Sequence, residues 1–396
     1  MVKGRFIVNP FTELVLTEND HVQLQDLANS IVMTNLDKFN AHQAENRKHV
    51  DMHRWKLVKE RQKIRMYTER SGTTTSSGNG LTGSGLPMLW CVGTMEGHLD
   101  DLMYGVVSPT LEAMRIKASY VDDFSGAAVL DTVVQPSLED PFQSLVVKWM
   151  EVDIPLASTS LVKNRDYVYL EGTGFVQSAR GERLGYHVIH SVSFPKTHDL
   201  PNRIRGNMSA VAFFRQMSNG NTMDIFGTAI MDPGGDMIRM LVVPSMAGAF
   251  LSSLKYAYCG QMKKLAWLLE KRYAESKQHG APNKKSVCVT CSTPITGRRL
   301  GDFGKSNSTC KLCFGFVCHA CKIVRKLSFV DPDLLLSQRK VTFCTACISE
   351  VTRLSAVDAA RAQMLSGTKH QGVNSGIQRS MSSDGNSTAS NYSISG

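Results

Sequence analysis

Eight of the ten cysteines lie in four C-x-x-C pairs within one stretch of the chain. The pairs are Cys288/Cys291, Cys310/Cys313, Cys318/Cys321 and Cys344/Cys347. Each pair can present two thiolates to one metal ion, and a structural zinc ion takes four such ligands in a closed tetrahedron. The four pairs therefore predict two zinc ions, with all eight cysteines as ligands.

Disulfide formation and redox chemistry are the alternative uses of such pairs. Disulfides need an oxidising compartment, and the N-terminus MVKGRFIVNPF lacks the apolar core of a signal peptide. A redox C-x-x-C normally occurs once, near a βαβ pattern. The sequence thus favours zinc and a cytoplasmic protein.

The spacing of the pairs bears on which of them share a metal. Eighteen residues separate the first two pairs, which is the spacing of a single sequential zinc ribbon. Only four residues, 314–317, separate the second pair from the third, which leaves little room for a boundary between two independent ribbons. An interleaved arrangement suits this gap better, with pairs one and three on one zinc and pairs two and four on the other.

This order of pairs, with C-x-x-C-x4-C-x-x-C at its centre, resembles the FYVE zinc finger. The resemblance implies docking on endosomal membranes through phosphatidylinositol 3-phosphate. Lys311 matches the basic residue that follows the third cysteine of the family, but 305–309 contains no histidine or arginine, and Thr342 stands where an arginine usually precedes the last pair. The N-terminal W-x-x-D signature is also missing. The resemblance therefore covers the metal ligands and little of the head-group pocket.

Basic residues are concentrated in the same region. The net charge is +10, and 284–350 contains eleven Lys and Arg against four Asp and Glu, a net +7. A compact basic surface suits anionic lipid head groups or nucleic-acid phosphates. The candidate head-group residues are Lys311, Lys322, Arg325 and Lys326. We expect them to give weak, salt-sensitive binding to acidic membranes, with little preference for the 3-phosphate isomer.

Length and composition fit one large domain and one small one. The chain has 396 residues, of which 42% are hydrophobic, as in ordinary globular proteins. No apolar run reaches the roughly 18 residues that a membrane span requires. The best candidate, 240–251, is short and contains Pro244.

The elements that precede the cysteines begin with an amphipathic helix. Thr17 and Asp20 resemble a capping box, and apolar residues at mostly helical spacing predict a helix over roughly 20–48. The stretch 55–68 predicts a strand. The Gly, Ser and Thr of 71–85 predict a flexible insertion inside a hairpin, because the strand pattern resumes at Met88. The stretch 97–120 predicts two short helices.

Strands and a final helix complete this large domain. Aromatic and β-branched runs after Pro141, separated by glycine-bearing turns, predict an antiparallel meander. Pro244 then marks the start of a long helix through about Tyr273. An α+β helix-grip fold is therefore expected, in which a curved antiparallel sheet wraps around the last helix.

Over roughly 20–275 the chain resembles the START domain. The residues that carry this resemblance are Arg165-Asp166-Tyr167-Val168-Tyr169, Arg205-Gly206-Asn207 and Asp232-Pro233-Gly234-Gly235. The resemblance implies a cavity for one hydrophobic lipid, such as a sterol, phospholipid or sphingolipid. We expect a linker at 276–285, a FYVE-type finger at 286–350, a short helix at 351–365 and a disordered tail at 366–396 that is rich in Ser, Asn and Gly.

No pattern nominates a catalytic site. There is no G-x-S-x-G motif, and His187 and His190 lie three apart on a predicted strand, which places them on opposite faces. Cys91 and Cys259 are expected to be buried apolar residues. The preferred hypothesis is a non-enzymatic lipid-binding or lipid-transfer adaptor whose finger docks on a membrane surface or a protein.

The rival hypothesis is a zinc-dependent interaction module, either a RING-like ubiquitin ligase or a nucleic-acid-binding protein. RING domains generally use at least one histidine ligand, and the eight candidates here are all cysteines. Nucleic-acid readers tend to place aromatic residues among basic ones, whereas Phe314 and Phe316 lie between metal-binding pairs. Both features favour the adaptor and make a nucleic-acid partner less favoured, while a protein partner stays open.

Overall fold

The computed structural model describes most of the chain as two units. The described residues are 6–44, 50–70, 86, 88–121, 124–152, 163–235, 239–280, 286–295, 308–331 and 333–367. The N-terminal unit is Met1–Gly260 and the C-terminal unit is Gln261–Gly396, so the division falls inside helix α5 (Tyr256–His279). The predicted insertion 71–85 and nearly all of the predicted tail 366–396 lie outside the described residues.

The N-terminal unit begins its helical part with α1 (Glu18–Ala44), which confirms the predicted helix. Its start is a capping box: the backbone N–H of Thr17 donates to the Asp20 carboxylate (2.8 Å), and the backbone N–H of Asp20 donates to Thr17 Oγ1 (3.3 Å). Leu24 and Phe39 are buried on the helix face that meets the sheet. Local capping and an apolar stripe together explain why this segment is helical.

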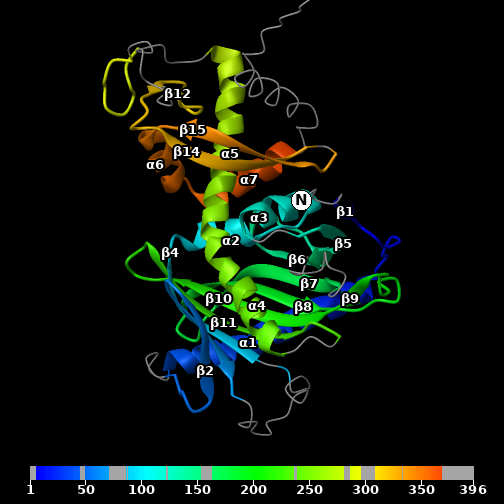
Figure 1. Ribbon diagram of the computed structural model, residues 1–396. Coiled ribbons are helices and arrows are strands. Elements are labelled where there is room, and N and C mark those ends of the chain that lie inside the picture. Colours follow the sequence, from blue (N-terminus) through cyan, green and yellow to red (C-terminus); the bar gives the residue numbers. More distant parts are fainter. Residues whose placement is uncertain are drawn as a thin grey trace, which may run out of the picture. The chain divides into compact units, whose positions relative to one another are not determined.

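One large sheet forms the body of the N-terminal unit (Figure 1). Its strand order is β1-β5-β6-β7-β8-β10-β11-β4-β3-β2, with β9 paired to β7. All pairings are antiparallel except β1 with β5 and β7 with β9. The strands are β1 (Ile7–Val8), β2 (Trp55–Arg61), β3 (Lys63–Glu69), β4 (Met88–Glu96), β5 (Gly126–Val134), β6 (Ser144–Val152), β7 (Asn164–Gln177), β8 (Arg183–Ser191), β9 (Arg203–Arg205), β10 (Asn207–Gln216) and β11 (Thr222–Asp232).

Helices cover both faces of this sheet. On one face α1 packs against strand residues such as Leu145, Leu170 and Phe213. The opposite face meets α2 (Leu99–Val106) and α4 (Arg239–Leu251): a Cβ on Gly185 would lie 2.5 Å from Met103, and one on Gly227 would lie 2.5 Å from Phe250. We call the second face the covered face. Helix α3 (Leu111–Tyr120) follows α2.

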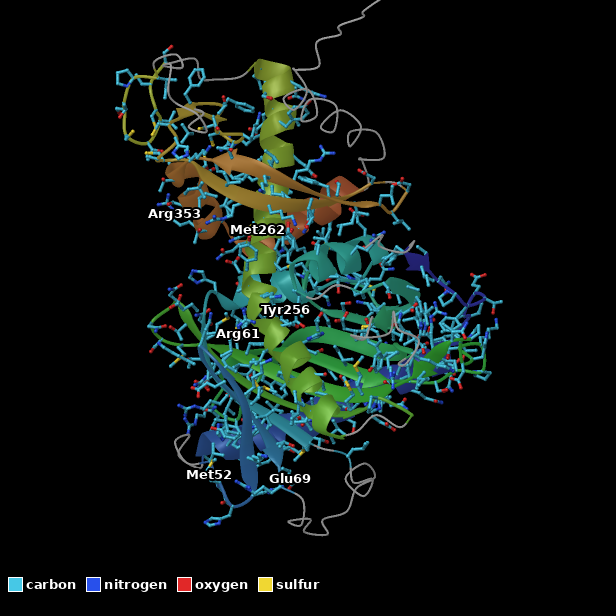
Figure 2. The ribbon with its side chains drawn as sticks, in the orientation of Figure 1. Met52, Arg61, Glu69, Tyr256, Met262 and Arg353 are labelled. Carbon is cyan, nitrogen blue, oxygen red and sulfur yellow. The ribbon has the colours of Figure 1, made fainter. Side chains whose placement is uncertain are left out.

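The structure corrects three predictions about these elements. The predicted strand 55–68 is a hairpin of β2 and β3, whose turn residue Gln62 has φ +56° (Figure 2 labels Arg61 and Glu69 at the ends of the two strands). Strand β5 was missed, because Gly126 and the alanines after it have low strand propensity. Pro244 lies inside α4 rather than at a helix start.

The predicted single helix 244–273 is also interrupted. Helix α4 ends at Leu251, a 3-10 turn occupies Ser252–Lys255, and α5 begins at Tyr256. Two glycines allow α5 to begin against α2: a Cβ on Gly105 would lie 1.9 Å from the carbonyl oxygen of Tyr256, and one on Gly260 would lie 1.9 Å from that of Asp101. The two helices therefore cross with their backbones in contact, which no larger residue permits.

The C-terminal unit contains the rest of α5, two small hairpins and two short helices. The hairpins are β12 (Ser308–Thr309) with β13 (Phe316–Val317), and β14 (Ile323–Val330) with β15 (Leu336–Phe343). Helices α6 (Thr345–Arg353) and α7 (Ala356–Gly367) replace the single short helix predicted at 351–365. The stretch 276–279, predicted as part of a linker, is the last part of α5.

A buried lysine fixes α5 to the end of α6 within the C-terminal unit. Lys264 is 0% exposed, and its Nζ donates to the carbonyl oxygen of Leu354 at 2.9 Å. A cation at this place satisfies carbonyl groups that a helix leaves unpaired at its C-terminus.

The curved, mostly antiparallel sheet with a C-terminal helix, followed by a small cysteine-rich region, confirms the predicted α+β helix-grip fold class with a two-centre finger.

Candidate metal centres and a buried polar cluster

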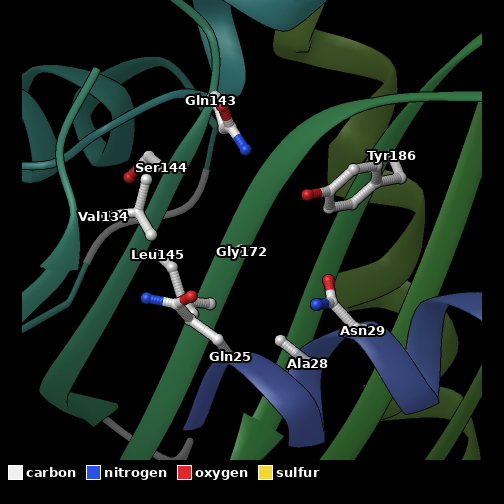
Figure 3. A pocket seen from close by; sticks show the side chains of 9 residues that line it. All are labelled: Gln25, Ala28, Asn29, Val134, Gln143, Ser144, Leu145, Gly172 and Tyr186. Carbon is white, nitrogen blue, oxygen red and sulfur yellow. The ribbon is translucent and has the colours of Figure 1, made fainter. Parts of the chain in front are cut away.

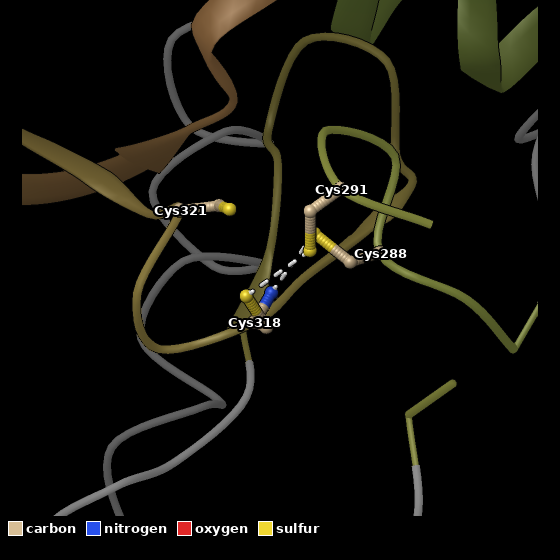
Figure 4. A group of neighbouring side chains, drawn as sticks. All are labelled: Cys288, Cys291, Cys318 and Cys321. Carbon is tan, nitrogen blue, oxygen red and sulfur yellow. Dashed lines mark hydrogen bonds between the residues drawn. The ribbon is translucent and has the colours of Figure 1, made fainter. Parts of the chain in front are cut away.

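The structure brings the cysteine pairs together in the interleaved order. Cys288, Cys291, Cys318 and Cys321 form one group, which Figure 4 shows, and Cys310, Cys313, Cys344 and Cys347 form the other. Within each group the four sulfur atoms lie within 4.8 Å of one another. All ten cysteines are free thiols, so no disulfide joins them.

The sulfur separations fit a metal ion better than any direct bond between sulfurs. Cys291 Sγ lies 3.8 Å from Cys318 Sγ, and Cys313 Sγ lies 3.9 Å from Cys344 Sγ. A tetrahedron with zinc–sulfur bonds of about 2.3 Å has edges of about 3.8 Å, whereas a disulfide measures about 2.0 Å. Each group is therefore a four-thiol site that could hold one metal ion.

Backbone N–H groups point at two of these sulfurs. The N–H of Cys318 donates to Cys288 Sγ (3.4 Å), and that of Cys347 donates to Cys344 Sγ (3.5 Å). Burial opposes ionisation of Cys288, but the backbone N–H groups of Cys318, Cys291 and Thr290 lower the pKa of its thiol to about 6. Such donors stabilise the thiolate, which is the form that binds a metal.

The predicted head-group residues do not share one surface. In the β14–β15 hairpin, Lys326 pairs with Lys340 and Arg325 pairs with Val341. Adjacent strand residues point to opposite faces, so Arg325 and Lys326 lie on different sides of the hairpin. Lys322 lies just before β14, and the backbone N–H of Lys311 donates to the carbonyl oxygen of Thr342 (3.0 Å), at the other edge of β15.

A second candidate site is a buried cluster of charges on the covered face of the sheet. Glu171 on β7 accepts hydrogen bonds from Lys148 on β6, from Lys117 on α3 (2.8 Å), and from His187 on β8 (2.7 Å). The Lys148 side chain is 1% exposed and that of Glu171 is 5% exposed. Lys148 also donates to the carbonyl oxygen of Ser108. We call these five residues the polar cluster.

Burial and mutual attraction set the ionisation of the polar cluster. Burial alone would raise the pKa of Glu171, but the ammonium groups of Lys117 and Lys148, with His187, hold it well below its usual range. Burial lowers the pKa of Lys148 to about 8, against the opposing attraction of Glu171. Burial likewise lowers the pKa of His187. At neutral pH Glu171 is therefore a carboxylate, Lys148 is an ammonium group and the imidazole of His187 is neutral.

The polar cluster is not arranged for nucleophilic catalysis. The Ser108 hydroxyl donates to Glu171 (3.3 Å) and accepts from Lys148 (3.2 Å), so its hydrogen bonds go to these two groups. A nucleophile needs a general base in hydrogen-bond contact, itself oriented by a third group. His187 instead bonds to Glu171 and packs its ring against that of Tyr256 at the start of α5 (5.6 Å).

A small pocket lies on the opposite face of the sheet, between α1 and β5–β8 (Figure 3). Its lining includes Gln25, Asn29, Leu145 and Tyr186, and its volume is about 100 Å³. Ligand pockets measure roughly 300–1,000 Å³. This pocket is thus too small for a lipid.

Sequence reasoning missed the polar cluster and Lys340. Lys148 stands in the otherwise apolar run Val146-Val147-Lys148-Trp149, and a charged residue in a strand buried on both faces needs a partner. That signal was available, but it does not identify the partner. Cys91 and Cys259 are buried, as predicted.

Among the helices that the structure describes, none is long and apolar enough to cross a membrane. No protein-family model and no curated protein matches the chain. It is similar to the solved structure of human StAR-related lipid transfer protein 5, with 13% identity and a TM-score of 0.41 over 60% of this chain and 98% of that chain. For human STARD10 the identity is 14% and the TM-score is 0.37, over 67% of this chain and 84% of that chain. For a fragment of the STAR-related lipid transfer protein from Xanthomonas axonopodis the identity is 16% and the TM-score is 0.36, over 52% of this chain and 99% of that chain.

Proposed function

We propose that this chain is a non-enzymatic adaptor that binds or transfers one hydrophobic lipid. The observation that carries the proposal is the polar cluster, a set of buried charges on the face of the sheet that α2 and α4 cover. Burying charges is costly unless they are paired, and a helix-grip fold gains little stability from placing them there. Their use would be to recognise the polar end of a lipid.

The lipid chain would lie between the covered face and α4. Apolar residues occupy this region: Met246, Ala247 and Leu251 of α4 are buried, and Phe250 contacts the sheet at Gly227. A head group that accepts hydrogen bonds would meet Lys117, because the three N–H donors of Lys148 already go to Glu171 and to two oxygens of Ser108. The two lysines together carry one more positive charge than Glu171 neutralises. The START resemblance of 20–275 implies the same location.

The finger would bind two zinc ions through the eight cysteines and dock the protein. Its FYVE resemblance implies peripheral association with endosomal membranes, and its surplus of basic residues supports an anionic surface as the partner. Little preference for phosphatidylinositol 3-phosphate is expected, because Thr342 replaces an arginine of the family pattern. A protein partner on the finger is the alternative form of docking.

Mass spectrometry of lipid that copurifies with the full chain tests the proposal. The full chain is needed because β1 pairs with β5, and Phe11 packs against Trp149 in the core, so a fragment that begins at residue 20 loses both contacts. We expect one lipid per chain, and transfer of that lipid between vesicles. Protein that carries no lipid and takes up none from vesicles would remove the hypothesis.

A further inference from the structure

Two lysines face each other across the β14–β15 hairpin. Lys326 and Lys340 are directly opposed in the strand register, and both are exposed. Among the residues that the structure describes, no hydrogen bond or ion pair links either ammonium group to another group. Directly opposed residues have Cβ atoms roughly 5 Å apart, and like charges in such positions destabilise the pair of strands. The hairpin therefore carries an uncompensated repulsion.

The rest of the hairpin holds this pair in place. Leu327, Val341 and Phe343 are buried, so the register cannot slip without exposing them. On the side of the hairpin that carries the two lysines, the cross-strand pair nearer the cysteines is Val324 with Thr342, and Val324 is 42% exposed. The pair nearer the turn is Ser328 with Gln338, whose side chains are hydrogen-bonded to each other (3.0 Å). The surface formed by Val324, Lys326, Lys340 and Thr342 is the lysine face. It combines two fixed cations with one exposed apolar side chain.

We propose that the lysine face binds the phosphate monoester of an anionic lipid head group at a membrane surface. A phosphate monoester carries about −1.5 to −2 charges at pH 7, which would neutralise both ammonium groups and remove their repulsion. Val324 would meet the interfacial region beside the head group. The proposal rests on the proposed docking role of the finger, and it assigns that role to one side of the hairpin.

Other polyanions fit the lysine face less well. Single-stranded nucleic acid is bound by basic grooves with aromatic side chains on which bases stack. Phe329 is the aromatic residue of the two strands that lies away from the cysteines. It pairs with Ser337, and its side chain points to the side of the hairpin opposite the lysine face. Arg339 lies over its ring at 6.0 Å. An exposed valine beside two lysines would instead offer a membrane surface both an apolar side chain and positive charge.

Vesicle sedimentation with the full, zinc-loaded chain tests the assignment. Phosphatidylcholine vesicles would contain either phosphatidylinositol monophosphates or phosphatidylserine at equal total charge. We expect tighter binding to the monophosphates than to phosphatidylserine. The affinities for the different monophosphate isomers should lie within about twofold of one another. Lys340→Thr should weaken binding about fivefold, the equivalent of about 1 kcal/mol for one lysine near an anionic surface. Lys326→Glu should weaken it about thirtyfold, since it changes two charges.

Arg325→Thr is the matched control, because it removes the same charge from the adjacent residue on the other side of the hairpin. We expect it to weaken binding less than twofold. A second readout separates binding from folding: Lys340→Thr should raise the midpoint of thermal unfolding of the finger, because the repulsion is gone, and Arg325→Thr should not. Loss of vesicle binding with gain of stability is a combination that misfolding cannot produce.

Three outcomes would overturn the assignment. Equal losses for Arg325→Thr and Lys340→Thr would mean that charge acts diffusely, and the docking role would survive without a lysine face. Displacement from vesicles by 10 mM inorganic phosphate, beyond an equal ionic strength of chloride, would mean that the site takes free phosphate. Wild-type protein that binds no anionic vesicle at low salt would remove the docking role together with the lysine face, while leaving the lipid-uptake result untouched.

Discussion

Replacing Glu171 with glutamine tests whether the polar cluster is buried and charged. The substitution keeps the size of the side chain but removes the one negative charge shared by Lys148, Lys117 and His187. Removing one partner of a buried ion pair costs about 3–5 kcal/mol, because it leaves an uncompensated buried charge. Lys148 keeps its bond to the Ser108 carbonyl oxygen and Lys117 keeps one to that of Val106. We therefore expect a loss near 3 kcal/mol in the free energy of unfolding.

The loss should depend on pH in a defined direction. The pKa of Lys148 is about 8 in the folded protein and about 10.4 when unfolded. Between these values the unfolded chain binds more protons, so this group makes stability rise with pH. Without Glu171 the folded pKa falls further, since the attraction that raised it is gone. The free energy of unfolding of the variant should therefore begin to rise below pH 8. The difference in this free energy between the variant and the wild type should narrow between pH 7 and 9.

Urea unfolding followed by tryptophan fluorescence measures these changes. Trp55, Trp90 and Trp149, three of the four tryptophans, report on the N-terminal unit. Glu182→Gln is the control, because Glu182 bonds to Arg215 but is 37% exposed, and Arg215 keeps Asp224 as a partner; we expect a loss below about 1 kcal/mol. Adding Lys148→Met to Glu171→Gln should restore about 2 kcal/mol. A loss below 1 kcal/mol for Glu171→Gln would refute the reasoning.

The remaining predictions concern the metal centres and the helices. Metal analysis should return two zinc ions per chain, and Cys313→Ser should remove one and unfold the finger while the urea transition of the N-terminal unit stays unchanged; one zinc or none in the wild type would contradict this. Leu254→Asp, in the 3-10 turn between α4 and α5, should abolish lipid uptake or unfold the N-terminal unit, and normal uptake by the variant would show that this turn does not contact the lipid. Gly105→Ala should lower the free energy of unfolding by more than about 3 kcal/mol, because its Cβ would lie 1.9 Å from the carbonyl oxygen of Tyr256. Gly181→Ala, in an open turn with φ +76°, should cost only about 1 kcal/mol by the same urea assay.

The features that were predictable from the sequence are those encoded locally. Two cysteines with two residues between them can reach one metal ion by local geometry alone, and the short gap 314–317 allowed the interleaved grouping to be inferred. The capping box at Thr17 likewise involves neighbours in the chain. The polar cluster was not predictable in the same way. Its members come from β6, β7, β8 and α3, and only the sheet register determines which of the buried polar residues meet.

Close contacts between helix backbones were also not predictable from the sequence. Gly105 and Gly260 each cost helix stability of about 1 kcal/mol relative to alanine, so their presence inside helices signals a close approach. The sequence does not say which two helices approach, because that requires the three-dimensional path from α2 through the whole sheet to α5. Pro244 was wrongly interpreted as a helix start because proline is tolerated in the first turn of a helix, whereas α4 begins five residues earlier, at Arg239.

The lysine face lies between these two cases. Asp331, Pro332 and Asp333 are turn-forming residues, and the flanking segments are rich in strand-forming side chains. In a hairpin centred on Asp333, residues equally distant from it face each other, which is the register observed for Ile323 with Phe343 and for Lys326 with Lys340. The turn alone thus implies that two lysines are opposed. Treating Lys311, Lys322, Arg325 and Lys326 as one basic group ignored this parity, because net charge carries no direction, whereas a strand assigns each residue a side.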